Sequence, residues 1–373
     1  MTARHYGMDW LRICAFGLLI FYHIGMFFVH WDWHVKTADP VEWVAVPMLA
    51  LNPWRLPLLF VVSGFASRAL MARTAGPGAF VRSRSARLLI PLAVGMVLIV
   101  PPQPWVEMVV EHGYRNSYPF FWLNDYFRFG AIADDLIVPT WQHLWFVVYL
   151  WVYSLLIAVA TPLGRRVHAQ TWFDRWFARK RASWIVLAWF VLAQGVLARG
   201  QTSTNALVDD WPGHIIFLPA FLFGFALARS ETAWAGIRRW WHVAALIAAM
   251  AYSFVAGVEL LYPGRTPIPV WLELPYFSIR AAQGAAGVIA LIGMADRFWN
   301  RDHPVRATLN EAVFPFYIIH QTAIVVAGWY LLRFRLPPLA EFAILLVVTT
   351  VACLLFYLAG RRVGWLRPLI GLK

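Results

Sequence analysis

Hydrophobic residues run along this chain in repeated stretches close to the length at which an α-helix crosses a bilayer, about twenty residues. The stretch near 213–228 is the shortest, and Pro212 and Pro219 interrupt it. The pattern predicts ten membrane spans near residues 10–30, 47–67, 88–105, 141–163, 182–199, 213–228, 240–262, 272–296, 308–332 and 338–360.

The composition supports this interpretation, because 61% of the residues are hydrophobic and the mean hydropathy is +0.60. A soluble core cannot hide that much apolar surface. We therefore expect an all-α, polytopic bundle of about ten transmembrane helices, forming a single domain over residues 1–373. The first apolar segment holds Arg12 and His23 and lacks a small-residue cleavage site, so we expect no cleavable signal peptide.

The basic residues indicate the orientation of the spans. The N-terminal tail and the loops on its side hold 22 Lys and Arg, whereas the opposite loops hold 6. Cytoplasmic loops carry the excess of basic residues, so both termini are predicted to be cytoplasmic. The net charge of +13 lies largely in those loops and gives no reason to expect a nucleic-acid partner.

Arg12 and His23 share the first apolar segment. Eleven residues of helix place both side chains on one face, about 16 Å apart along the axis. Arg12 lies near the inner edge, where snorkelling to the interface is the ordinary explanation, and Asp9 is a candidate partner for it. His23 lies far deeper, where the alternatives are a hydrogen-bonded core histidine and a functional group.

His320, in the segment FPFYIIHQTAIVV, lies about as deep as His23 in a span that also runs outward. Two imidazoles at matching depth could share one cavity. His143 lies at the outer end of its span beside Trp141 and Trp145, so we interpret it as interfacial, with acceptor binding as the alternative.

Two further cations fall within spans, Arg55 and Arg280. Pro53 and Pro57 flank Arg55 and should break or bend the second span, which frees backbone groups for other partners. Ser63 and Gly64 then allow close helix approach, although Ser63 is also a candidate for substrate binding.

Arg84 and Arg87 stand three residues apart at the inner start of the third span, on one helical face. Two guanidinium groups there suit a phosphate-bearing ligand. Anchoring to inner-leaflet lipid, combined with the topology signal, is an equally good explanation of the residues alone.

Other chemistries find little support. The sequence holds no GxSxG elbow, zinc-spaced His/Glu helix, P-loop or dinucleotide fingerprint, and we expect no metal and no permanently bound cofactor. The pattern of His34 followed, after four residues, by Asp39 resembles a motif of glycerolipid acyltransferases. In the predicted topology, however, it lies on the outer side.

Several motifs together resemble the family-three membrane acyltransferases. They are Arg12, ten residues and then His23; FVVSGF in the second span; Arg84 and Arg87 before Pro91; and HLWFVVYL. With WDWHVKTADP, LPAFLFGFAL and FPFYIIHQT in the same order, the chain is most similar to the branch that contains the periplasmic glucan succinyltransferases.

The resemblance implies a ten-helix enzyme of the bacterial inner membrane. It would move an acyl group from cytoplasmic acyl-CoA, its co-substrate, to a hydroxyl of an extracytoplasmic glycan such as periplasmic glucan. His23 would be the general base, with His320 as a second proton-handling group. Arg12, Arg84 and Arg87 would hold the CoA portion. A succinyl donor, favoured over acetyl, would need a cation for its carboxylate, and Arg55 or Arg280 could supply it.

The principal alternative is a secondary transporter or flippase for a glycan or lipid-linked sugar, because buried charges and proline-interrupted helices also mark transport sites. A sensor that binds glycans without turnover is a weaker alternative. The transporter and the sensor both predict that no CoA-dependent product forms.

Overall fold

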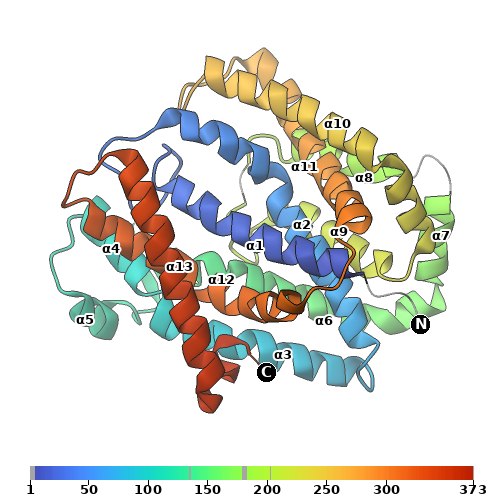
Figure 1. The fold of residues 1–373 in the computed structure, drawn as a ribbon, viewed down its shortest axis with the longest axis horizontal. Coiled ribbons are helices and arrows are strands. Elements are labelled where there is room, and N and C mark those ends of the chain that lie inside the picture. The colour runs from blue at the N-terminus through green and yellow to red at the C-terminus, as the bar shows by residue number, and fades with distance from the viewer. Residues whose placement is uncertain (1–4, 134–135, 179–182, 202, 373) are drawn as a thin grey trace. The chain divides into compact units, whose positions relative to one another are not determined.

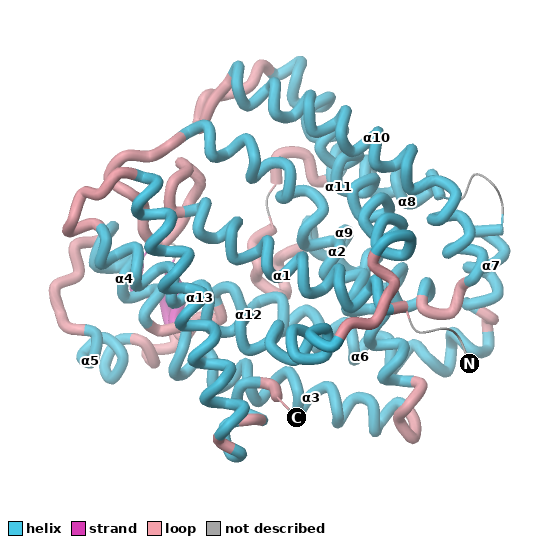
Figure 2. The backbone as a smooth tube through the Cα atoms, viewed as in Figure 1, coloured by secondary structure: helices cyan, strands magenta, loops and turns pink. Residues whose placement is uncertain are grey.

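The computed structural model describes residues 5–133, 136–178, 183–201 and 203–372. Helix dominates these residues, and the tube in Figure 2 shows a single small region of strand among them. The α-helices are α1 Tyr6–Met26, α2 Ala45–Met71, α3 Pro77–Val94, α4 Pro102–Glu111, α5 Tyr118–Phe120, α6 Trp145–Arg166, α7 Ala169–Ala178, α8 Ser183–Phe190, α9 Trp211–Leu227, α10 Glu231–Leu261, α11 Val270–Phe298, α12 Pro304–Leu331 and α13 Pro338–Arg362.

The helices confirm the predicted all-α polytopic fold. Eight helical segments in the described chain are long and apolar enough to cross a membrane, and two shorter apolar helices, Trp184–Leu197 and Trp211–Leu227, coincide with the remaining predicted spans. The largest difference lies in the third span, where helix continues from Pro77 to Glu111 with a π-helical segment at Gly95–Ile99. The cytoplasmic placement of the termini remains a prediction.

The chain groups into two compact units, each assembled from three separate stretches. The first unit contains residues 1–15, 46–84 and 149–310, and the second contains 16–45, 85–148 and 311–373. The expectation of a single domain remains a prediction, and each unit is described by itself below.

Close helix contacts in the first unit depend on glycine. A methyl group at Gly64 of α2 would overlap the carbonyl of Phe221 in α9, and one at Gly224 would overlap the carbonyl of Val61. The close approach expected of Gly64 is therefore present. In the same unit α10 and α11 run side by side (Figure 1), with Gly293 packed against the indole of Trp241.

Helix α2 continues through Pro53 and Pro57, so of the expected break or bend the break is absent. Pro53 has no N–H to donate to the carbonyl of Leu49, four residues earlier. The side-chain amide of Gln283, in α11, donates to that carbonyl at 2.9 Å. As predicted, the proline frees a backbone group, and a neighbouring helix binds it.

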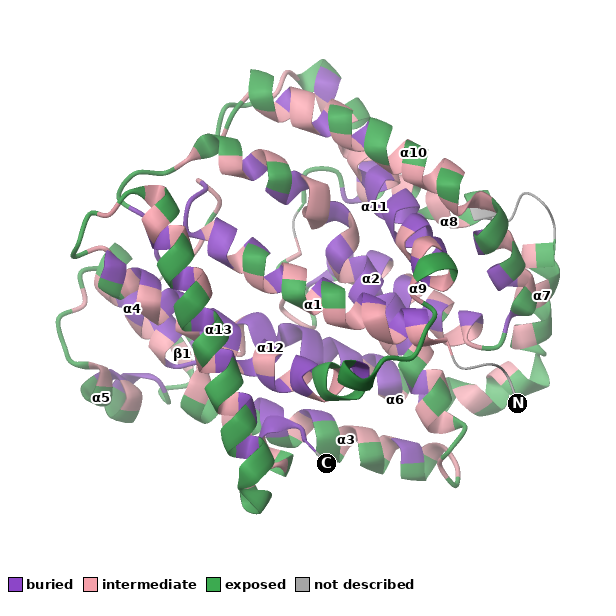
Figure 3. Ribbon diagram, viewed as in Figure 1, coloured by how far each residue is buried: buried purple, intermediate pink, exposed green. Residues whose placement is uncertain are grey.

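The second unit is built around α12, whose central turns are largely buried, whereas much of α13 is exposed (Figure 3). Ile324 and Val325 of α12 pack with Ile24, Phe27 and Phe28 in one apolar cluster. On α12 this cluster follows directly after the polar residues 320–322.

The segment after α4 holds α5, a π-helical turn and a two-stranded antiparallel hairpin, β1 Gly130–Ala133 with β2 Leu136–Val138. Gly130 pairs with Val138. The Tyr126 hydroxyl donates to the carbonyls of Met96, at 2.8 Å, and Thr140, at 3.1 Å, and burial raises the pKa of Tyr126. These bonds fix the hairpin to the end of the third span.

Candidate active site

A run of three polar residues interrupts the buried face of α12. His320, Gln321 and Thr322 are 0%, 4% and 7% exposed. Buried polar groups are costly unless they are hydrogen-bonded. The partners of these three side chains define the candidate site, and all of them belong to the second unit.

His320 and His23 are hydrogen-bonded to each other. The distance from His23 Nδ1 to His320 Nε2 is 2.8 Å, and the rings are stacked with centroids 5.0 Å apart. His320 Nδ1 lies 2.8 Å from the carbonyl oxygen of Tyr317. The structure thus brings together the two histidines that the sequence placed at matching depth.

These contacts fix the proton positions in the neutral pair. A carbonyl can only accept, so His320 Nδ1 carries a proton and donates to Tyr317. In a neutral ring His320 Nε2 is then the acceptor, and His23 Nδ1 donates to it. The basic lone pair of His23 therefore lies on Nε2. His23 is half-buried whereas His320 is fully buried, so His23 is the more accessible end of the pair.

Trp33 flanks the accessible end. Its ring stacks on His23 with centroids 5.3 Å apart and planes at 29°. An aromatic face against an imidazole limits the rotation of the imidazole and also favours a cationic ring. This packing suits a histidine that gains positive charge during a reaction.

The ring of His143 also packs on His320, edge to face, with centroids 5.4 Å apart and planes at 88°. His143 is buried within the second unit, and its location at the membrane interface remains a prediction. His143 Nε2 donates to the carbonyl of Ile318 at 3.0 Å, and Nδ1 accepts from Gln103 at 3.3 Å. Both ring nitrogens are therefore engaged within the protein, which favours a positioning role.

Gln103 and Gln321 extend this network. The Gln103 amide donates to Thr322 Oγ1 at 2.7 Å, and its oxygen accepts from Gln321 at 3.0 Å. Gln321 also donates to His34 Nε2 at 3.2 Å, and His34 Nδ1 lies 2.5 Å from Glu107. His34 thus pairs with a carboxylate of α4, not through the His34–Asp39 pattern noticed in the sequence.

Sequence reasoning did not assign Gln103, Gln321, His34 or Glu107 to this network. A signal was available, because Gln103 and Glu107 lie four residues apart and therefore on one helical face. Their partners, however, are separated from them by up to 219 positions in the chain. Local patterns do not reveal contacts at that separation.

Arg12 lies in the first unit, near the start of α1. Its guanidinium donates to the backbone oxygen of Asn310 at 3.1 Å and also to the side-chain oxygen of Asn310. Asp9, the partner suggested by sequence, accepts from Arg306 at 2.6 Å. Asn310, in α12, therefore supplies two acceptors to Arg12.

The two arginines of α3 differ in environment. Arg84 is half-buried and donates through Nε to the hydroxyl of Ser154 at 3.1 Å. Arg87 is exposed. Their spacing on the helix keeps both available as candidates for phosphate binding.

The remaining candidates lie in α2 and α11 of the first unit. Arg55 is buried, at 7% exposure, and Arg280 donates to Asn52 at 2.8 Å. The backbone oxygen of Ser63 accepts from Ser67 at 2.7 Å. Asn52 is neutral, so this contact does not itself neutralise Arg280, whose guanidinium suits an anionic group.

The described fold is that of a multi-pass membrane protein. Its second unit holds a hydrogen-bonded pair of histidines, of which His320 is buried and His23 half-buried. A family model described as "Acyltransferase domain" matches residues 5–358, nearly the whole chain, so the protein belongs to that family. The resemblance noted in the sequence is confirmed.

The chain is also similar to curated proteins with a common name. Proteins named Glucans biosynthesis protein C from Escherichia coli O1:K1, O139:H28 and O157:H7 are each 29% identical to this chain over 153 residues. The matched region covers 41% of this chain and 38% of each relative. No solved structure matches the chain.

Proposed function

We propose that this protein is an O-acyltransferase of the bacterial inner membrane, which transfers an acyl group from cytoplasmic acyl-CoA to a hydroxyl of an extracytoplasmic glycan. Membership of the acyltransferase family supports the reaction class, and the name of the Escherichia coli relatives supports glucan as the acceptor. The observation that carries the proposal is the bonded series from the Tyr317 carbonyl through His320 to His23.

In this mechanism His23 is the general base. The acceptor hydroxyl oxygen attacks the thioester carbonyl carbon, and its proton passes to His23 Nε2. The carbon–sulfur bond then breaks, and the CoA thiolate takes up the proton from the His23 imidazolium, which returns His23 to its neutral form. The imidazolium of His23 keeps its Nδ1 bond to His320, which stabilises the positive charge while it lasts. Direct transfer of this kind forms no covalent acyl-enzyme.

Arg12, Arg84 and Arg87 are proposed to bind the donor. A guanidinium presents a planar set of N–H donors that matches phosphate oxygens. Arg12 donates to the two oxygens of Asn310, and Arg84 donates to the hydroxyl of Ser154. Their location on helices that begin at the predicted cytoplasmic side supports binding of CoA from there.

The acyl group is proposed to be succinyl in preference to acetyl. A succinyl group carries a free carboxylate, which needs a cation within the protein. Arg280 and the buried Arg55 supply candidates, and the contact of Arg280 with neutral Asn52 supports this assignment. Ser63 and His143 stay as secondary candidates for acceptor contact.

The test is an assay of the purified protein in liposomes with succinyl-CoA or acetyl-CoA and periplasmic glucan. Free thiol and glucan mass are followed together. We expect thiol release coupled to a glucan mass increase of one acyl group. A transporter or flippase would release no thiol with either donor while still moving labelled glycan across the bilayer, and that result would contradict the proposal.

A further inference from the structure

A large cavity lies in the first unit, within a group of helix ends separate from the histidine network. Its volume is about 960 Å³, at the upper end of the range of roughly 300–1,000 Å³ that ligand pockets occupy. It is bounded by α2, α6, α7, α8, α9 and α11.

Three arginines meet at this cavity. Arg68 is in the last turn of α2, Arg165 is in the last turn of α6, and Arg229 follows α9. Each ends a predicted span on the cytoplasmic side, at the depth of lipid headgroups. Among the described residues that line the cavity there is no Asp or Glu, so the lining carries uncompensated positive charge.

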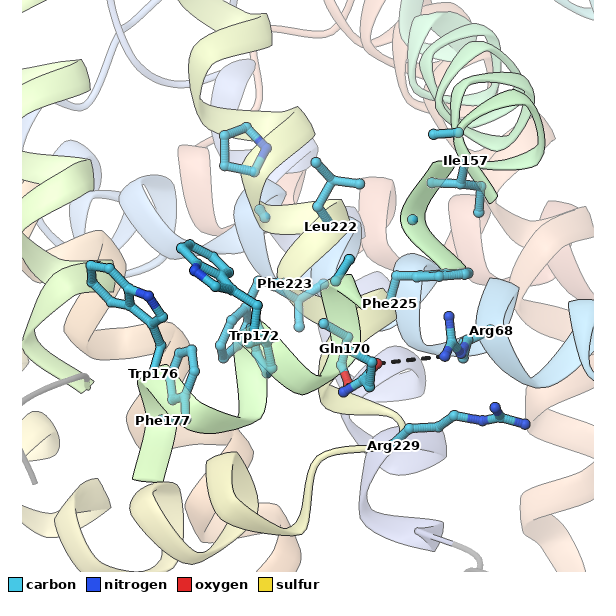
Figure 4. A pocket seen from close by; sticks show the side chains of 18 of the residues that line it. Arg68, Ile157, Gln170, Trp172, Trp176, Phe177, Leu222, Phe223, Phe225 and Arg229 are labelled. Carbon is cyan, nitrogen blue, oxygen red and sulfur yellow. Dashed lines mark hydrogen bonds between the residues drawn. The ribbon is translucent and has the colours of Figure 1, made fainter. Parts of the chain in front are cut away.

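Arg68 is held in place by neutral contacts. It donates to the side-chain oxygen of Gln170 at 3.5 Å, and its guanidinium lies over the ring of Phe225 at 4.5 Å (Figure 4). The Gln170 amide donates in turn to the carbonyl of Ala226 and to Asp174, both at 3.2 Å. Gln170 therefore orients the arginine without neutralising it.

The rest of the lining is mostly apolar and continues to the surface. Trp172 and Leu222 line the cavity and are 60% and 44% exposed. Helix α7 is fixed over α9 by Phe173 and Phe177, whose rings lie 6.2 and 5.8 Å from that of Phe223. In a protein that spans a membrane, an exposed apolar rim of this kind faces lipid chains.

We propose that this cavity binds an anionic phospholipid, with its phosphate among Arg68, Arg165 and Arg229 and one acyl chain along the aromatic side chains of α7 and α9. Basic pockets between helices on the cytoplasmic side suit anionic headgroups. The apolar lining favours a lipid over CoA, because the ribose and pantetheine groups of CoA need many polar partners. This site is independent of the proposed reaction.

Native mass spectrometry of the detergent-solubilised protein tests the proposal directly. Phosphatidylglycerol and phosphatidylcholine with identical acyl chains are titrated separately. We expect tighter binding of phosphatidylglycerol to the wild type, and binding about tenfold weaker or more in Arg68→Gln/Arg229→Gln. Arg361→Gln/Arg362→Gln, which removes the same charge from the exposed end of α13, should bind like the wild type.

A second variant tests the acyl-chain position. Ala160 lines the cavity and is exposed, so Ala160→Trp should occupy space there while all three arginines are kept, and should weaken retention of the lipid. Thermal unfolding of each variant verifies folding. Equal binding of the two lipids by the wild type, unchanged binding by the double arginine variant, or displacement of phosphatidylglycerol by CoA would overturn the proposal. Lipid binding is measured without turnover, so its failure is distinct from failure of the proposed activity.

Discussion

His23 Nδ1 and His320 Nε2 lie 2.8 Å apart, with their rings 12° from parallel, although 297 positions of sequence separate them. Because His320 also donates to the Tyr317 carbonyl, this contact determines which nitrogen of His23 is basic. The proposed chemistry depends on that basic nitrogen, His23 Nε2.

His320 is predicted to act by positioning His23. His320→Ala removes the acceptor for His23 Nδ1, so the wrong tautomer becomes populated and kcat should fall about tenfold or more with little change in KM. In His320→Gln the amide oxygen can still accept that bond, and the variant should recover much of the loss. The rate of thiol release under saturating donor and acceptor measures kcat for both variants. If the glutamine variant were as slow as the alanine variant, the tautomer argument would fail.

Arg12 is predicted to contribute to donor binding. Arg12→Lys keeps the charge but loses the guanidinium fork, so the KM for acyl-CoA should rise about tenfold while the KM for glucan stays the same. Arg361→Lys, at the exposed end of α13, provides the matched control and should leave both constants unchanged. An unaltered donor KM in Arg12→Lys would remove this assignment.

Arg280 is predicted to select the acyl group. In Arg280→Gln the succinyl carboxylate loses its cation, so kcat/KM for succinyl-CoA should fall about tenfold or more, whereas acetyl-CoA should be affected much less. A competition assay with both donors, read as the ratio of succinylated to acetylated glucan, measures the change. The same ratio in the variant and the wild type would eliminate the structural basis for a succinyl preference.

Gly224 is predicted to be required for packing of α9 on α2. A methyl group there overlaps the Val61 carbonyl, so Gly224→Ala should destabilise the protein by about 1–3 kcal/mol. Gly257, in α10, has open space around its Cβ position, and Gly257→Ala should be neutral or slightly stabilising. Thermal unfolding in one detergent compares the two. Equal transition temperatures for both variants would show that the α2–α9 contact relaxes easily.

Hydropathy was sufficient to locate the spans, because helices in a bilayer must be long and apolar regardless of their partners. It did not predict their ends. Helix α1 begins at Tyr6 and α10 at Glu231, since polar residues at the interface continue a helix without any apolar signal. The amphipathic helix α7 was absent from the predicted spans for the same reason.

The candidate site was predictable in part. The depth of His23 and His320 within their spans was enough to mark them as candidates, because polar groups inside a membrane are costly and therefore often functional. The partners of His34, Gln103 and Gln321 depend on helix packing and on rotamers, neither of which the sequence encodes locally. Pro53 shows the opposite case, where covalent chemistry alone predicted a freed carbonyl and the structure supplied Gln283 as its donor.

The most direct test of the central claim is the initial rate of acyl transfer by His23→Ala relative to the wild type and to His242→Ala, a variant of an exposed histidine in α10. If His23 is the general base, its loss should lower the rate about 10²- to 10⁴-fold, with the folded protein and donor affinity retained. The His242 variant should match the wild type. A His23→Ala protein that kept transfer within about threefold of the wild type would contradict the account.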